Sequence, residues 1–354
     1  MMTGLSDLQF YRASAPLSKS ESEEFIATIW QPSKAFNTFE LSSYFKFIET
    51  ERTRESRINN PVYSQLRFKD FFDIRHIIFM NHDKSAPDLQ ALVQNKLSSF
   101  DLEPEVLQDI IILVIRLTFM IRVEFHSPYS HPAPFQLQMQ VTQSFQETLN
   151  KVQIGPPSRE WSMQHELPLW FNVIDLERKA NLRIGWTDYL NEHLTYQSGT
   201  LMLFRHIKVL EYIERSEIQA DNFFKLEFLI ETRRSILLFF PLNEYKYITH
   251  DYLDWFQGRG PIEEWQRLLA RHDPNSPISR FYEDFPIWHS KLLYLLNISN
   301  NQGNWGLKRC WYDDRDQGLW WTRWTLITAI FLAILFGLIQ SITGIIQVVY
   351  AGRS

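Results

Sequence analysis

The side chains best suited to acid-base chemistry lie in two short polar stretches. His165 and Glu166 are neighbours, and Asp188 lies shortly before His193. An imidazole or a carboxylate can accept or donate a proton near neutral pH, which makes these four residues candidates for general acid-base catalysis. No serine or cysteine is marked as a nucleophile by a sharp, glycine-bounded turn. The sequence therefore favours a simpler interpretation, in which the four belong to a charged face beside the core.

Metal and cofactor sites have weaker support. His126 and His131 come nearest to the spacing of metal ligands, in a segment rich in proline, but no thiolate and no carboxylate pair accompanies them. The two common glycine-rich motifs of nucleotide-binding loops, Gly-x-x-x-x-Gly-Lys-Ser/Thr and Gly-x-Gly-x-x-Gly, do not occur. We therefore expect ordinary loop histidines, with no metal, no cofactor and no catalytic residue.

Composition indicates a large folded body that does not bind nucleic acid. The chain has 354 residues, of which 45% are hydrophobic and 15% aromatic, and this is ample for a buried core. Its formal net charge of -5 gives no basic footprint for nucleic acid. Cys310 is the only cysteine, so no internal disulfide can form. A protein with this cysteine usage is expected in a reducing compartment such as the cytosol.

Hydrophobic spacing predicts a mainly α fold with a small β element. Apolar residues recur at three- and four-residue intervals over 41–57 and 66–80, which is typical of amphipathic helices. A more apolar helix is predicted over 106–125, where Arg116 interrupts the run and favours a core helix over a membrane span. Short apolar runs predict a small sheet, with strands at 167–171, 182–186 and 201–204.

One segment near the C-terminus is apolar enough to cross a membrane. From Trp324 to Tyr350 the chain has 27 residues without a charged side chain. At about 1.5 Å per residue a helix of this length reaches roughly 40 Å, against a hydrocarbon core of roughly 30 Å. Trp320, Trp321 and Trp324 would form an aromatic belt at one interface, and Tyr350 would lie at the other.

The flanks of this helix indicate its orientation. Lys308, Arg309, Arg315 and Arg323 precede the helix, whereas Arg353 alone follows it. Basic residues concentrate on the cytoplasmic side of membrane helices, so the large N-terminal part is expected in the cytosol. The polar, serine-rich N-terminus has no signal-peptide pattern, and we expect a single-pass, tail-anchored protein. The long, weakly polar helix favours the endoplasmic reticulum or later secretory membranes.

The domain organisation that we expect has five parts. They are a disordered polar tail (1–24), a soluble, mainly helical domain (25–297), a polar linker (298–319), the transmembrane helix (320–350) and a short C-terminal tail (351–354).

Small and amide-bearing residues recur on one face of the membrane helix. Steps of three and four residues connect the members of this face: Ala329, Ala333, Gly337, Gln340, Gly344, Gln347 and Ala351. Small residues let two helices approach closely in lipid, and glutamine amides can form hydrogen bonds between helices. The pattern predicts self-association, mainly through Ala333, Gly337, Gln340, Gly344 and Gln347. The alternative is a helix that merely tolerates weakly polar residues.

Several segments resemble uncharacterised fungal membrane proteins that carry a C-terminal transmembrane helix. The resemblance rests on the following stretches: 186–190 (Trp-Thr-Asp-Tyr-Leu), 203–210 (Leu-Phe-Arg-His-Ile-Lys-Val-Leu), 231–234 (Glu-Thr-Arg-Arg), 239–241 (Phe-Phe-Pro) and 336–344 (Phe-Gly-Leu-Ile-Gln-Ser-Ile-Thr-Gly). More loosely, the build is similar to that of CorA-type magnesium channels, which implies a cytosolic helical domain before a membrane part. Those channels have a second span and a Gly-Met-Asn motif, and this sequence has neither.

Three functions fit the residues. The first is a membrane-attached binding or scaffold protein, whose partners would be the lipid bilayer, a second copy of the chain and an unknown cytosolic protein. The second is a divergent CorA-like ion transporter subunit, with Gln340 and Gln347 lining a pore in an oligomer. The third is a membrane-attached enzyme, although no catalytic motif is found.

Overall fold

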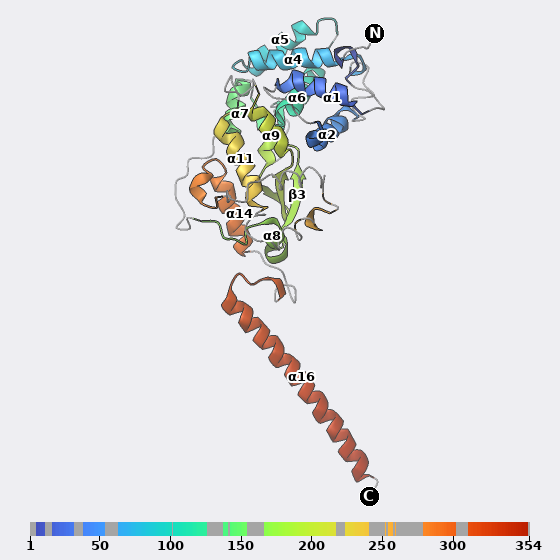
Figure 1. Ribbon diagram of the computed structural model, residues 1–354, viewed down its shortest axis with the longest axis vertical. Coiled ribbons are helices and arrows are strands. Elements are labelled where there is room, and N and C mark those ends of the chain that lie inside the picture. The colour runs from blue at the N-terminus through green and yellow to red at the C-terminus, as the bar shows by residue number, and fades with distance from the viewer. Residues whose placement is uncertain are drawn as a thin grey trace.

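A computed structural model gives the fold as a body of helices and small sheets from which one long helix extends (Figure 1). It describes residues 5–10, 16–31, 38–53, 63–100, 102–125, 137–140, 142–153, 166–216, 224–240, 252, 254–257, 259, 279–301 and 311–352. Within these residues the chain is mainly helical, which confirms the predicted fold class.

The helices of the body precede the long helix α16. In chain order they are α1 (Lys19–Trp30), α2 (Ser42–Arg52), α4 (Phe68–Met80), α5 (Ala86–Lys96), α6 (Pro104–Phe119), α7 (Phe145–Gln153), α8 (Val173–Ala180), α9 (Ile207–Glu214), α11 (Leu226–Leu238) and α14 (His289–Asn301). The long helix is α16 (Gln317–Ala351). Short 3-10 turns are η1 (Leu5–Asp7), η2 (Thr38–Leu41), η3 (Tyr63–Gln65), η4 (Leu190–Glu192) and η5 (Tyr282–Asp284).

Two small sheets complete the body within the described residues. Their strands are β1 (Val123–Phe125), β2 (Leu137–Met139), β3 (Arg183–Thr187), β4 (Thr195–Gln197) and β5 (Thr200–Phe204). The first sheet pairs β1 with β2 in parallel, and the second has the order β3-β5-β4. A two-residue turn joins β4 to β5, with positive φ at Ser198 (50°) and Gly199 (80°). Turns of this kind match the twist of the strands that they connect.

Helix α6 is the central element of the N-terminal half. Nine of its residues are buried, and they come from more than one side of the helix. Its last carbonyl groups have no partner inside the helix and must be satisfied by other groups. The Trp30 indole of α1 donates to the carbonyl of Thr118 at 3.2 Å, and the Tyr44 hydroxyl of α2 donates to the carbonyl of Leu117. These bonds fix α1 and α2 on the end of α6.

The C-terminal half of the body is built around the three-stranded sheet. Helix α8 contacts both β3 and α14, and α11 packs beside α9. In Figure 1, α8 and the end of α14 form the part of the body nearest to α16. In this view (Figure 1) α8 and α14 are therefore the elements of the body nearest to the long helix.

Helix α16 differs from every other described element. Among the described residues it is the one helix long and apolar enough to cross a membrane, and none of its residues is buried. Its 35 residues correspond to roughly 50 Å at about 1.5 Å per residue. Helix α6, the other strongly apolar segment, lies in the core of the body, as the sequence predicted.

Three sequence predictions differ from the structure. The expected polar tail contains the buried residues Leu5 and Phe10, and α1 begins at Lys19, where Ser18 and Glu21 form a capping box. The helix expected to continue to residue 125 ends at Phe119, because Met120 adopts a left-handed conformation (φ 50°) and β1 follows. Residues 167–171 form a turn before α8, whereas the other two predicted strands are present as β3 and β5.

Candidate functional site

Helix α16 has two amide side chains with unused hydrogen-bonding capacity. Its hydroxyl groups bond to its own backbone: Ser341 donates to the carbonyl of Gly337 at 2.8 Å, and Thr343 donates to the carbonyl of Ile339. Within the described residues, the amides of Gln340 and Gln347 make no hydrogen bond. They are therefore the groups of the helix that are most able to bond to another helix.

The predicted interface anchors lie at the two ends of α16. The Trp320 ring packs against the rings of Trp321 and Trp324, with centroid distances of 5.0 and 6.0 Å. Trp311, which the sequence analysis did not select, joins this cluster at 5.4 Å from Trp324. Tyr350 is 72% exposed at the opposite end. Four tryptophans therefore gather where α16 leaves the body.

Arg315, in an ion pair with Asp313, connects the body to the chain that enters α16. The Arg315 guanidinium donates to Asp313 Oδ1 at 2.7 Å, and both side chains are largely buried. Arg315 also donates to the carbonyl of Ser299, near the end of α14, and to the carbonyl of Lys179, near the end of α8, at 3.2 Å. Arg323 of α16 donates to the carbonyl of Asp313 at 3.3 Å. One arginine thus links α8, α14 and the chain that enters α16.

A second ion pair strengthens the same junction. The Lys179 ammonium lies 2.6 Å from Asp314 and 3.1 Å from Asp175. Burial lowers the pKa of Lys179, but its bonds to these two carboxylates outweigh burial and raise that pKa above its usual value. We name this group the latch: Lys179, Asp313, Asp314, Arg315 and Arg323. Residues 311–316, which the sequence analysis assigned to a linker, include three of its members.

The structure brings together a serine, a histidine and an aspartate that are far apart in sequence. Asp188 Oδ1 lies 2.6 Å from His206 Nε2, and Ser43 Oγ lies 3.2 Å from His206 Nδ1. Arg205 forms an ion pair with the same Asp188 oxygen. Burial raises the pKa of Asp188, but His206 and Arg205 lower it below the usual value. An ionised Asp188 can therefore accept the Nε2 proton of His206.

The bond pattern at His206 is that of a nucleophilic serine with its base, but the site is enclosed. Burial lowers the pKa of His206, so the ring is neutral and its Nδ1 can accept the Ser43 proton. The ring of His206 packs between Phe47 and Phe204. His206 is fully buried and Ser43 is 4% exposed. In this conformation the group ties α2 to the sheet and is closed to a substrate.

His193 has a different set of partners from those that the sequence analysis proposed. It does not contact Asp188; its Nδ1 accepts the backbone N–H of Phe204 at 3.3 Å, and its Nε2 lies 2.8 Å from Ser235 Oγ. The ring must then carry its proton on Nε2 and donate it to Ser235, which is opposite to the role of a base. Burial lowers the pKa of His193 well below its usual value. This histidine is a neutral, satisfied core residue.

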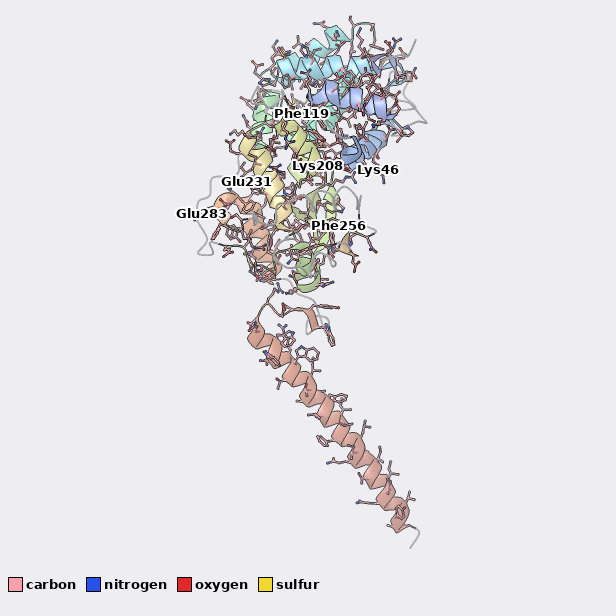
Figure 2. All side chains as sticks on the ribbon, viewed as in Figure 1. Lys46, Phe119, Lys208, Glu231, Phe256 and Glu283 are labelled. Carbon is pink, nitrogen blue, oxygen red and sulfur yellow. The ribbon has the colours of Figure 1, made fainter. Side chains whose placement is uncertain are left out.

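Two buried charged groups hold the start of α14. Glu231 lies on α11 (labelled in Figure 2), and its carboxylate accepts the backbone N–H groups of Ile287 and Trp288, at 2.8 and 2.7 Å. Burial raises the pKa of Glu231 to about 7, although these two bonds and Arg234 oppose the rise. Lys291 donates to the carbonyl of His193 at 2.7 Å, and burial lowers the pKa of Lys291 to about 8.

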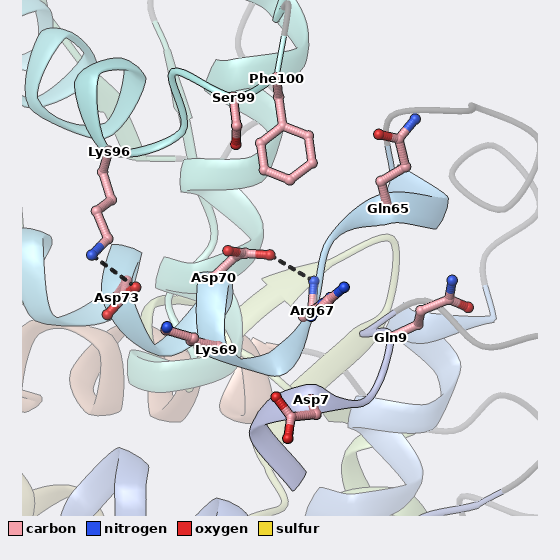
Figure 3. A pocket seen from close by; sticks show the side chains of 10 residues that line it. All are labelled: Asp7, Gln9, Gln65, Arg67, Lys69, Asp70, Asp73, Lys96, Ser99 and Phe100. Atoms are coloured by element: carbon pink, nitrogen blue, oxygen red, sulfur yellow. Dashed lines mark hydrogen bonds and ion pairs between the residues drawn. The ribbon is translucent and has the colours of Figure 1, made fainter. Parts of the chain in front are cut away.

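An open groove lies at the far end of the body from α16. Its volume is about 710 Å³, and η1, α4 and α5 line it (Figure 3). Lys96 and Asp73 form an ion pair across it at 3.0 Å, and Asp70 accepts the backbone N–H of Arg67 at 2.8 Å. Side chains of both charges and an aromatic ring, Phe100, line the same groove. This mixture indicates no particular class of small ligand.

The remaining sequence candidates have limited support. His126, His131 and His165 lie outside the described residues, and Glu166 is exposed. No cluster of three potential metal ligands occurs within the part of the chain that the structure describes. Sequence reasoning selected Asp188 but missed its partners Ser43 and His206, and it missed the latch. Neither group has a local motif, because in both cases the partners come from distant segments.

Replacing Glu231 with Gln tests the buried carboxylate. A folded-state pKa of about 7, against an ordinary 4.5, means that the folded protein binds this proton more tightly than the unfolded chain. The contribution of Glu231 to the unfolding free energy should therefore decrease as pH rises from about 4.5 to 7 and stay constant above that. We expect the difference in unfolding free energy between the parent and Glu231→Gln, measured by chemical denaturation, to show this dependence on pH.

Glu227→Gln, which removes an exposed carboxylate from the same helix, controls for the loss of one charge. The prediction would be contradicted if the difference in unfolding free energy between the parent and Glu231→Gln stayed constant from pH 4.5 to about 7. The Glu231 carboxylate would then have the same pKa in the folded and the unfolded chain.

Comparison with protein-family models, with curated proteins and with solved structures finds no match to this chain. The resemblance to fungal membrane proteins and to CorA-type channels therefore stays a prediction. Function has to be argued from α16, the latch and the body themselves.

Proposed function

We propose that this protein is a membrane-attached binding or scaffold protein, held by α16 as a single membrane-spanning helix. The observation that carries the proposal is the exposure of large apolar side chains around α16, among them Phe331 (64%), Phe336 (59%) and Ile345 (64%). Exposing these groups to water is costly, whereas the hydrocarbon of a bilayer solvates them. The lipid bilayer is thus the first partner of the chain.

The body is proposed to face the cytosol. The basic residues Arg315 and Arg323 lie on the body side of α16, and Lys308 and Arg309 precede them in sequence. The excess of basic residues on this flank supports the orientation. The endoplasmic reticulum or a later secretory membrane is proposed as the location. The groove of Figure 3, which side chains of both charges line, is the proposed binding site for a polar segment of a cytosolic protein partner.

An enzymatic function is the second candidate, and one observation favours it. Ser43, His206 and Asp188 have the contacts of a catalytic triad, with the two ring nitrogens in exchanged roles. The burial of Ser43 and His206 argues against it. Labelling of Ser43 by a fluorophosphonate in the folded protein would favour an enzyme, and absence of labelling would favour a structural role.

Self-association through α16 is part of the proposed function. Building a Cβ atom on Gly337 or Gly344 meets no atom within 4 Å, so this face is open to a second helix. Gln340 and Gln347 lie on the same face and are exposed. Close backbone approach and amide hydrogen bonds are two of the main sources of helix association in lipid.

Charged substitutions in α16 test membrane integration. The double change Leu335→Arg and Leu338→Arg should cost about 5 to 7 kcal/mol, at about 2.5 to 3.5 kcal/mol for each arginine near a helix centre. We expect the parent to remain in the membrane pellet after alkaline carbonate extraction and the variant to move to the supernatant. Protease added outside sealed vesicles should digest the body of the parent.

Met80→Arg and Tyr294→Arg, at two exposed positions of the body, form the matched control and should stay in the pellet. Release of the parent by carbonate would refute the membrane anchor, and protection of the body from protease would refute its orientation.

Bulky residues on the small face test self-association. Gly337→Ile together with Gly344→Ile should weaken association by about 1 to 2 kcal/mol, or roughly five- to thirtyfold in the association constant. The measurement is energy transfer between donor- and acceptor-labelled full-length copies in lipid vesicles. Leu335→Ile with Ile342→Leu keeps side-chain volume on the opposite face and should leave the transfer unchanged. Equal transfer in the parent and in the glycine variant would exclude this face as the contact.

A further inference from the structure

The side of the body nearest to α16 carries an exposed aromatic and aliphatic surface. We name this the basal surface: Leu169, Trp170, Trp311 and Tyr312. Leu169 is 51% exposed, Trp311 is 66% exposed and Tyr312 is 44% exposed. Its two segments are far apart in sequence, and the Arg315 guanidinium joins them, because it lies 5.3 Å from the centre of the Trp170 ring. The surface is thus built around the latch.

We propose that the basal surface lies in the headgroup layer of the membrane and forms a second contact with lipid besides α16. The inference rests on the proposed membrane anchor. Its first support is continuity, because the Trp311 ring contacts Trp324 at 5.4 Å, at the start of the apolar run of α16. Trp311 therefore lies close to the depth at which the tryptophan belt of α16 meets the interface.

The chemistry of the surface also fits this layer. Tryptophan and tyrosine combine an apolar ring with one hydrogen-bonding group, and they concentrate where hydrocarbon meets headgroups. Isolated exposed apolar residues are ordinary on a protein surface, but here three exposed ones flank one ion pair beside a membrane helix. Headgroups would cover the rings and still hydrate their polar atoms.

Three basic side chains near the basal surface pair with carboxylates of the protein. Arg315 pairs with Asp313 at 2.7 Å, Arg323 lies 3.8 Å from the same carboxylate, and Lys179 lies 2.6 Å from Asp314. Salt weakens contacts between exposed charges and has little effect on ring burial. The basal contact should therefore form on zwitterionic phosphatidylcholine, without anionic lipid, and persist at high salt.

Depth-dependent fluorescence quenching tests the contact in the full-length protein. In a Cys310→Ser background, single cysteines replace Leu169 or Tyr312 and carry an environment-sensitive fluorophore. The protein is reconstituted into phosphatidylcholine vesicles that contain a lipid with a spin label on its headgroup. We expect quenching at both positions to exceed that at Met80→Cys and Tyr294→Cys by at least about twofold, as interfacial residues should. Phosphatidylserine or added salt should not change the ratio.

An Ile334→Cys label with a spin probe in the acyl chains distinguishes the two proposals. The basal contact would be overturned, and the anchor kept, if Ile334 were quenched while the headgroup label quenched Leu169 and Tyr312 no more than the two control positions. No quenching at Ile334 would overturn the anchor itself. A contact that forms only with phosphatidylserine would contradict the aromatic character of the surface.

Discussion

Arg315, paired with the buried carboxylate of Asp313, holds the two parts of this molecule together through its bonds to the body. A buried charge that loses its partner is strongly destabilising, by about 3 to 5 kcal/mol, so the pair forces its neighbours into one arrangement. Arg315 uses its remaining donors on the carbonyls of Ser299 and Lys179, which lie near the ends of α14 and α8. The chain entering α16 is thereby fixed to the body at several points. Helix α16, attached in this way, has a fixed orientation relative to the body.

Helix α14 transmits that constraint into the core. One end provides the Ser299 carbonyl to the latch, and the other end is held by Glu231, which accepts the N–H groups of the two residues just before the helix. Lys291, in the first turn of the same helix, donates to the carbonyl of His193 beside the sheet. Two titratable groups of the body, Glu231 and Lys291, are therefore used to position α14. Their pKa shifts have a structural cause, namely burial beside the groups that they position. Active sites show shifts of the same kind, so these shifts do not by themselves identify an active site.

The sequence predicted the elements whose signal is local and missed the sites that depend on distant contacts. Helix α16 follows from its uncharged run, and α6 was recognised as a core helix because Arg116 interrupts it. The latch was predicted as a linker, since Asp313 and Arg315 are polar and only the fold buries them. Ser43 and His206 are 163 positions apart, and no spacing rule joins them. Self-association stays a prediction, because the structure holds one copy of the chain and therefore no second copy of α16.

The central claim is that the body is held rigidly relative to the membrane helix. The most direct test is the distance distribution between spin labels at Tyr294→Cys, on α14, and Leu326→Cys, on α16, in lipid nanodiscs of the Cys310→Ser protein. We predict a narrow distribution that Arg315→Gln broadens and that Arg183→Gln, at an exposed arginine of the sheet, leaves narrow. A broad distribution in the parent, or a narrow one in Arg315→Gln, would contradict the account.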